Sequence, residues 1–146
     1  MNCCSRQNKL HNYKKDDISL FNFKGKKCLA KIVDVYDGDT FTAVFKYRNE
    51  FIKYNFRTYG YDSPEMRPLK SKPDRDEEKI AAIKAREAFK SVTDWENTLI
   101  TLDMLGFDKY GRILVNVYKK KLHINKWMID NGHGYEYHGG TKKDKV

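Results

Sequence analysis

Residues 28–47 alternate apolar and polar side chains, with one interruption by the sequence DGD at positions 37–39. A period of two places the apolar residues on one face of a β-strand, and Asp and Gly favour tight turns. We therefore predict two antiparallel strands joined by a turn at DGD. The alternation returns in residues 51–61 and predicts a third strand that ends near Gly60.

The period changes after Asp74. Small and apolar residues now recur at steps of four and three, which is typical of the core-facing stripe of an amphipathic helix. The predicted stripe consists of Ala81, Ala85, Ala88, Val92 and Trp95. Residues 98–105 and 113–119 predict two further strands, and residues 123–132 predict a short helix that Gly132 ends.

This order of elements predicts an α+β, mainly β fold. Five short antiparallel strands can close into a Greek-key barrel of the OB type. A long helix connects strands three and four, and a short helix follows the last strand. We expect the domain to span residues 28–138, between a flexible basic N-terminal arm at 1–27 and a basic C-terminal tail at 139–146. Three apolar residues are predicted to anchor the arm on the domain: Leu20, Phe21 and Phe23.

The charge balance narrows the class of partner. Among 146 residues, 29 Lys and Arg outnumber 20 Asp and Glu, which gives a net charge of +9. Such a field attracts polyanions, of which nucleic acid is the commonest and anionic membrane the second. The three cysteines have no regular spacing, so neither a disulfide framework nor a zinc site is expected. The N-terminus lacks the apolar stretch of a secretory signal, which predicts an intracellular protein.

Three polar clusters follow the ends of predicted strands: residues 37–40, residues 57–65 and residues 108–112. Each cluster alone has the composition of an ordinary turn. Strand ends on one side of a barrel converge, however, so the three clusters together predict one site. Two carboxylates from different loops can bind a hard cation, a third can act as a general base, and two arginines can hold phosphoryl oxygens.

The motifs DVYDGDTFTAVF, FRTYGYDSPE and DKYGRILVNVY, together with the helix between them, resemble the staphylococcal nuclease (thermonuclease) family. The resemblance runs from about residue 28 to residue 132, with the motifs in the order of the family. The family pattern usually has Thr at the position of Ser63 and continues with a C-terminal helix that this chain lacks. The resemblance implies an SNase-like OB-fold domain.

The resemblance also implies roles for individual residues. It implies one calcium ion bound by the carboxylates of Asp39 and Asp62 and the backbone carbonyl of Ser63. Glu65 is the implied general base, and Arg57 and Arg112 the implied ligands of the scissile phosphate. The implied substrate-binding residues are Lys109, Tyr110, Tyr135 and Tyr137, although the last two lie a few residues earlier than in the family.

The implied function is calcium-dependent hydrolysis of single-stranded or frayed DNA and RNA, by endonuclease or exonuclease cleavage, to products with a 3′-phosphate. No obligate protein partner is implied. A nuclease-like module that binds RNA or protein without cleaving is the alternative, and the complete active set favours the enzyme. Cys3 and Cys4 are weakly compatible with acylation and membrane attachment.

Overall fold

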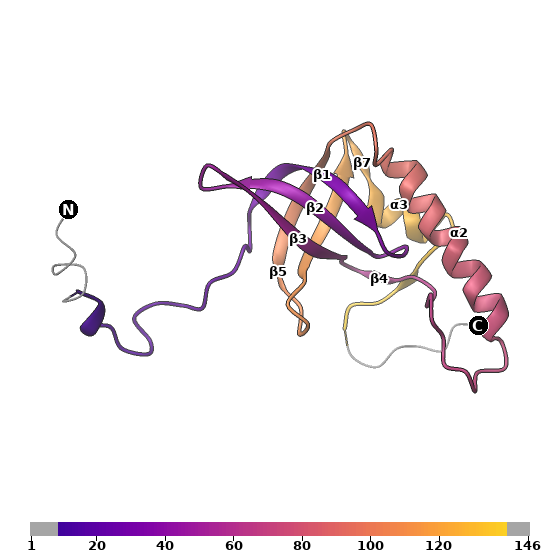
Figure 1. Ribbon diagram of the computed structural model, residues 1–146, viewed down its shortest axis with the longest axis horizontal. Helices are drawn as coiled ribbons and strands as arrows, with labels where there is room; N and C mark the ends of the chain where they lie inside the picture. Colours follow the sequence, from indigo (N-terminus) through magenta and orange to yellow (C-terminus); the bar gives the residue numbers. More distant parts are fainter. Residues whose placement is uncertain (1–8, 140–146) are drawn as a thin grey trace.

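The computed structural model describes residues 9–139. Five long strands form the body of the domain, and two helices cover one end of it (Figure 1). The elements, in chain order, are β1 (Lys27–Val35), β2 (Thr40–Tyr47), β3 (Glu50–Thr58), β4 (Tyr61–Asp62), α2 (Arg75–Thr93), β5 (Ile100–Phe107), β6 (Ile113–Lys119), β7 (Leu122–His123), α3 (Ile124–Asp130) and β8 (Tyr135–Glu136). The prediction of an α+β, mainly β chain with a five-stranded barrel is confirmed.

The five long strands close into a mixed barrel. β1 pairs with both β2 and β5, β2 pairs with β3, and β5 pairs with β6, all of them antiparallel. The ring is closed by β3 and β6, which run parallel with Phe56 opposite Ile113. The prediction of five antiparallel strands is therefore wrong at this one pairing. A closed ring with an odd number of strands cannot alternate direction throughout, so one neighbouring pair must be parallel.

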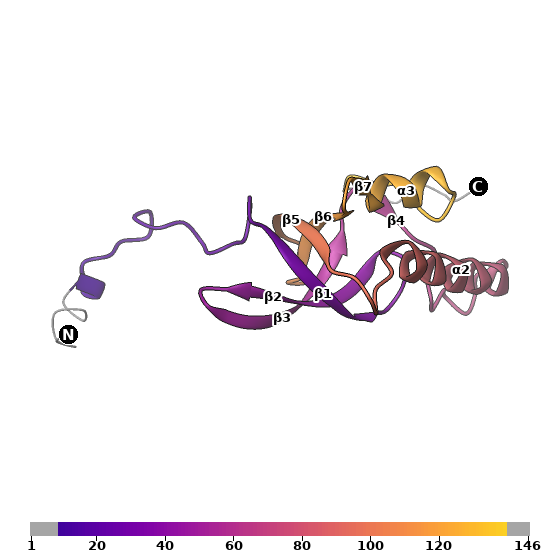
Figure 2. The same ribbon diagram turned by 90° about the horizontal axis from the view of Figure 1, so that it is seen from above.

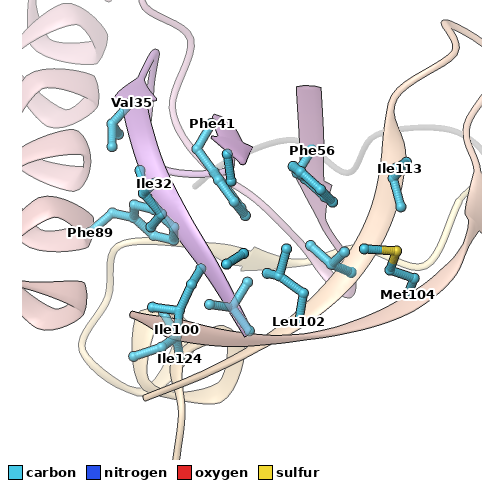
Figure 3. Close-up of a cluster of buried hydrophobic side chains, with 14 of the residues drawn as sticks. Ile32, Val35, Phe41, Phe56, Phe89, Ile100, Leu102, Met104, Ile113 and Ile124 are labelled. Atoms are coloured by element: carbon cyan, nitrogen blue, oxygen red, sulfur yellow. The ribbon is translucent and has the colours of Figure 1, made fainter. Parts of the chain in front are cut away.

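The alternating apolar residues fill the barrel. On β2 the side chains of Phe41, Ala43 and Phe45 are at most 2% exposed, and on β3 Phe56 is fully buried. The rings of Phe41 and Phe56 stack with centroids 5.3 Å apart. Figure 3 shows this cluster continuing to side chains of β5 and α3. Burial of a side chain of this size contributes about 1.5–3 kcal/mol, so this cluster is the main source of stability.

Helix α2 lies against one end of the barrel (Figure 2). The face that it buries is slightly different from the predicted one. Of the predicted stripe only Ala85 is fully buried, and Trp95 lies beyond the end of the helix. The buried positions are Glu78, Ala82, Ala85, Phe89 and Thr93. The two stripes are adjacent on the helix surface, and the large ring of Phe89 selects the one that faces the core.

The C-terminal part contains features that no periodicity signals. β4 and β8 form a separate two-stranded sheet, in which Asp62 lies opposite Tyr135. Helix α3 ends at Asp130, and Gly132, two residues later, stops it as predicted. Gly132 has φ +76°, and the N–H of His133 donates to the carbonyl of Met128 at 2.9 Å, as in a Schellman motif.

The segment that precedes β1 is only partly anchored. Phe23 is 6% exposed, and its ring meets those of Phe45 and Tyr47 at centroid distances of 5.7 and 5.1 Å. Phe21 contacts Phe23 but is 57% exposed, and Leu20 is 92% exposed, so the anchoring role predicted for Leu20 is wrong. Residues 9–22 extend away from the barrel on the side opposite α2 (Figures 1 and 2). Cys3, Cys4 and the tail beyond residue 139 lie outside the described residues.

In the part of the chain that the structure describes, no helix has both the length and the apolar character needed to cross a membrane.

Candidate functional site

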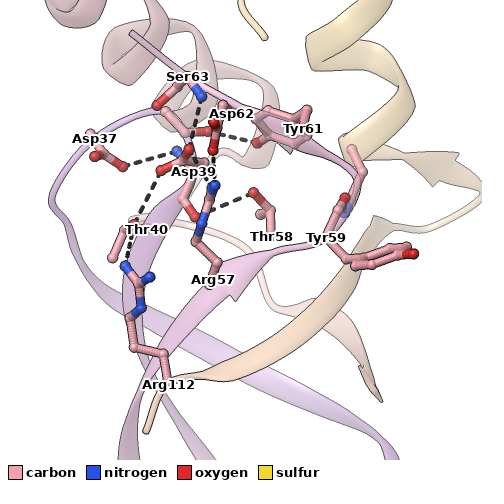
Figure 4. Close-up of polar contacts among 12 residues, drawn as sticks. Asp37, Asp39, Thr40, Arg57, Thr58, Tyr59, Tyr61, Asp62, Ser63 and Arg112 are labelled. Carbon is pink, nitrogen blue, oxygen red and sulfur yellow. Dashed lines mark hydrogen bonds and ion pairs between the residues drawn. The ribbon is translucent and has the colours of Figure 1, made fainter. Parts of the chain in front are cut away.

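A cleft of about 900 Å³ lies on the outer surface of the barrel. Three connections line most of it: the turn between β1 and β2, the segment from the end of β3 to Glu65, and the turn between β5 and β6. The segment that follows β8 completes the lining with residues 137–139. Arg57 points outward into this cleft because its neighbours Phe56 and Thr58 point into the core. Figure 4 shows polar side chains from all three connections directed toward one another.

The turn between β1 and β2 is held rigidly. The backbone N–H of Asp39 donates to Oδ1 of Asp37 at 3.0 Å, and the buried hydroxyl of Tyr61 donates to the carbonyl of Gly38 at 2.6 Å. A Cβ atom at Gly38 would lie 2.8 Å from the Cβ of Ser63 and 2.9 Å from the Cβ of Ala85. Glycine is therefore required at position 38 because the turn packs closely against the helix and against the segment that follows β4.

Arg57 lies between two buried carboxylates. Its guanidinium forms ion pairs with both Asp39 and Asp62 (Figure 4). The side chain of Arg57 is 13% exposed, and Asp39 and Asp62 are 6% and 4% exposed. Burial acts to lower the pKa of Arg57, but the two carboxylates outweigh it, and the pKa lies above its ordinary value. Arg57 thus stays charged and fixes the two acidic residues at the mouth of the barrel.

The cluster contains more negative than positive charge. Asp37 is the third carboxylate, and burial together with the neighbouring charge of Asp39 raises its pKa to about 8. Burial is the larger cause of this raised pKa, and the charge of Asp39, which Arg57 does not fully neutralise, adds to it. A hard divalent cation with oxygen ligands would relieve the excess, so the donor set of Asp39 and Asp62 suits calcium.

Within residues 9–139, no group of three or more His, Cys, Asp or Glu side chains is arranged to hold a metal ion. A calcium ion would therefore need backbone carbonyl and water ligands to complete its shell. Ser63 is the predicted source of the carbonyl. It is 4% exposed, and its N–H donates to Oδ2 of Asp39 at 2.8 Å, which keeps its backbone beside the acidic pair.

Glu65 lines the cleft with an exposed side chain, and its backbone is tied to helix α2. The N–H of Glu65 donates to Oε1 of Glu78 at 3.2 Å. Glu78 is 8% exposed, and its other oxygen accepts a hydrogen bond from Nζ of Lys72 at 2.5 Å. The first turn of α2 thus holds both ends of the loop that carries Glu65. The helix pattern of the sequence does not distinguish Glu78 from its exposed acidic neighbours.

Arg112 reaches the cleft from the turn between β5 and β6. Asp108 organises this turn: its carboxylate accepts the N–H groups of Tyr110 at 2.8 Å and Arg112 at 3.0 Å, and Nε of Arg112 at 2.7 Å. Burial acts to raise the pKa of Asp108, but the hydrogen bonds from Arg112 lower it below its ordinary value. Arg112 also contacts the hydroxyl of Thr40 at 3.5 Å, which places its guanidinium beside the strand that follows Asp39.

The predicted substrate-binding residues divide into two groups. Lys109, Tyr110 and Tyr137 line the cleft, and the ring of Tyr110 is 72% exposed. Nζ of Lys109 lies 5.1 Å from the centroid of that ring. Tyr135 does not line the cleft but lies on β8, opposite Asp62.

Besides the buried Tyr61, two exposed tyrosines that the sequence analysis did not single out also line the cleft. Tyr36 is 53% exposed and Tyr59 is 39% exposed. Tyr59 follows Arg57 by two residues and lies one residue beyond the end of β3, so the alternation of that strand, continued by one residue, is the signal that identifies it. The rings of Tyr59 and His138 lie 5.5 Å apart between centroids.

The fold and the cleft together define a closed mixed β-barrel that presents an acidic pair, a buried arginine and a second arginine on one surface. No protein-family model and no curated protein matches this chain.

Proposed function

We propose that this chain is a calcium-dependent nuclease of the staphylococcal nuclease type, which hydrolyses phosphodiester bonds in single-stranded or frayed DNA and RNA. The observation that carries the proposal is the convergence of two kinds of group in one cleft of about 900 Å³. The carboxylates are those of Asp39, Asp62 and Glu65, and the guanidinium groups are those of Arg57 and Arg112.

We assign the barrel to the Greek-key OB type as part of the same proposal. The strand order supports this assignment, since β5 returns to pair with β1 and β6 lies between β5 and β3. In a simple meander each strand would instead pair with the next one along the chain. OB barrels commonly bind oligonucleotides across one face, which agrees with the net charge of +9.

The proposed roles follow from the chemistry of each group. Arg57 and Arg112 donate paired hydrogen bonds to phosphoryl oxygens and stabilise the charge that develops on them, which the single ammonium group of lysine does less well. Glu65 accepts a proton from the attacking water. Calcium, when bound by Asp39, Asp62 and the Ser63 carbonyl, neutralises phosphate charge and orients the reacting groups.

The remaining residues bind the substrate. Lys109 and the hydroxyl of Tyr110 contact a phosphate next to the one that is cleaved, which leaves the Tyr110 ring free to meet a base, and Tyr137 packs against the nucleotide. Cleavage leaves a 3′-phosphate on the product. We expect weak sequence preference, because contacts to phosphate carry little information about the base.

The proposal is tested by incubating the protein with single-stranded DNA and RNA in calcium and in chelator. Wild-type protein should cleave both in calcium only, and Glu65→Gln and Arg57→Ala should lower the rate about 10²–10³-fold or more. The products should be extended by a polymerase only after a phosphatase has removed the 3′-phosphate.

Two variants serve as matched controls. Glu87→Gln removes a carboxylate that is 57% exposed on α2, and Lys121→Ala removes an exposed cation between β6 and β7. Both should cleave at close to the wild-type rate. Cleavage that persists in chelator, or that Glu65→Gln leaves unchanged, contradicts the proposal. Calcium-independent binding with no cleavage by the wild type would instead support the alternative, a module that binds RNA without cleaving it.

A further inference from the structure

A second hollow, of about 280 Å³, lies beside the main cleft. It is formed by the outer face of the β2–β3 hairpin and the turn between β5 and β6. The hairpin contributes one group that only donates hydrogen bonds, the ammonium of Lys53, and two that both donate and accept them, the amide of Asn55 and the hydroxyl of Thr42. Together they can bind phosphate, sugar and base edges, whereas an apolar ligand would leave them unsatisfied.

The hollow is continuous with the proposed active site along one strand. Lys53, Asn55 and Arg57 alternate along β3 and therefore share its outer face, at steps of about 7 Å. Arg57 is the innermost of the three and contacts the acidic pair. A row of side chains thus leads from the scissile position outward to Lys53.

The turn between β5 and β6 connects the two spaces as well. Tyr110 and Arg112 line both the main cleft and the second hollow. The guanidinium carbon of Arg112 lies 5.3 Å from the centroid of the Tyr110 ring. The exposed ring therefore stands between the two spaces as a surface on which a base can stack, and stacking of this kind contributes about 1–3 kcal/mol per base.

The polar groups of the hollow are held in place. Thr42 and Asn55 are cross-strand partners, and the Thr42 hydroxyl donates to Oδ1 of Asn55 at 2.8 Å. This bond fixes the orientation of the amide. The hairpin around them carries three exposed cations against one acid, with Lys46, Arg48 and Lys53 against Glu50, so its outer face attracts a polyanion.

We propose that this hollow is an additional nucleotide subsite, and that the natural substrate is accordingly an oligonucleotide strand that extends from the cleft along β3. The inference rests on the proposed nuclease function, whose substrate class it narrows. Lys53 contacts a phosphate of the strand beyond the scissile bond, Asn55 and Thr42 contact its sugar or base, and Tyr110 stacks on the base between the two spaces.

The experiment measures binding and cleavage separately as a function of substrate length. Binding of fluorescently labelled single-stranded DNA to the full chain carrying Glu65→Gln is followed by anisotropy, with a dinucleotide and with strands about eight nucleotides long. Lys53→Ala in that background should weaken binding of the long strand roughly fivefold and should leave the dinucleotide unaffected. The plot of log affinity against log salt concentration should become shallower, with a slope less negative by about 0.7, as expected for the loss of one phosphate contact to a single strand.

Lys121→Ala, which removes an exposed lysine between β6 and β7, is the matched control and should change neither quantity. In cleavage by otherwise wild-type protein, Lys53→Ala should raise KM for the long strand with little effect on kcat. A long strand that binds no more tightly than the dinucleotide, or equal losses for Lys53→Ala and Lys121→Ala, would overturn the subsite. The absence of cleavage with length-dependent binding intact would instead refute the nuclease function.

Discussion

Gly38 links the stability of the fold to the geometry of the acidic cluster. A Cβ atom at this position would lie 2.8 Å from the Cβ of Ser63 and 2.9 Å from the Cβ of Ala85. Both neighbours are Cβ atoms fixed to backbone, one of them on α2, so neither contact can be relieved by a rotation of a side chain. Gly38→Ala must therefore displace the β1–β2 turn, the helix or the segment after β4.

Overpacking of this kind costs about 1–3 kcal/mol, which corresponds to a loss of roughly 3–12 °C in Tm for a domain of this size. The displacement should also separate Asp39 from Ser63, whose N–H now donates to the Asp39 carboxylate at 2.8 Å. We expect Gly38→Ala to melt earlier in chelator and to gain less stability than wild type from added calcium, as measured by circular dichroism.

A double-mutant cycle with Ala85→Gly tests the proposed contact directly. Ala85→Gly alone should destabilise the protein, because glycine costs about 1 kcal/mol within a helix. It removes one of the two close contacts, however, so Gly38→Ala should cost less in that background than in the wild type. Additive effects of the two substitutions, or an unchanged Tm of Gly38→Ala, would refute the packing argument.

Three further outcomes follow from individual side chains. Phe23→Ala should lower stability by about 3–5 kcal/mol in denaturant unfolding, whereas Leu20→Ala, at a 92% exposed position, should have little effect; equal losses would contradict this. Glu78→Ala should release the loop of Glu65 and lower kcat more than it raises KM, with partial recovery in Glu78→Gln. Burial and, secondarily, the charge of Lys84 lower the pKa of His133 below 6.5. The unfolded state therefore binds more protons than the folded state, and Tm should fall as the pH drops through 6.5. His133→Gln should flatten this dependence of Tm on pH.

Much of the barrel follows from the period of the apolar residues. The strand predicted at residues 113–119 coincides with β6, and the hairpin around DGD coincides with β1 and β2 within a few residues. These strands are long, and each has one buried face, so the alternation is unambiguous. The parallel contact of β3 with β6 could not be predicted from any one strand, because it results from the closure of the whole ring.

The sequence did not predict the two-residue strands β4 and β8 or the burial of Glu78. β4 and β8 contain two residues each, which is too few for a period to exist. Their pairing depends on Gly134, where an added Cβ would lie 2.4 Å from the ring of Tyr61. Glu78 is one of three acidic residues in the first turn of α2, and the helix pattern gives no reason to expect it to be the buried one. Its burial depends on Lys72, in a loop whose course the sequence does not reveal.

The three polar clusters of the candidate site can be identified from the sequence alone, because their residue types and their order along the chain are enough to recognise them. The sequence could not indicate that Arg57 contacts both Asp39 and Asp62, nor that Tyr59 joins the cleft and Tyr135 does not. Those facts depend on the direction of side chains at the end of β3 and on the pairing of β4 with β8. The catalytic and metal-binding roles remain predictions that the proposed assays decide.

The charge balance of the cleft favours a functional origin for the cluster over a structural one. A buried ion pair contributes little net stability even when its charges match, because removing both partners from water is costly. At the turn between β5 and β6 the charges do match, since one carboxylate, Asp108, holds one guanidinium, Arg112. At Arg57 they do not, because two carboxylates, Asp39 and Asp62, contact one guanidinium. Stability alone would select against this excess of negative charge, and the cation site that we propose here would give a reason to retain it.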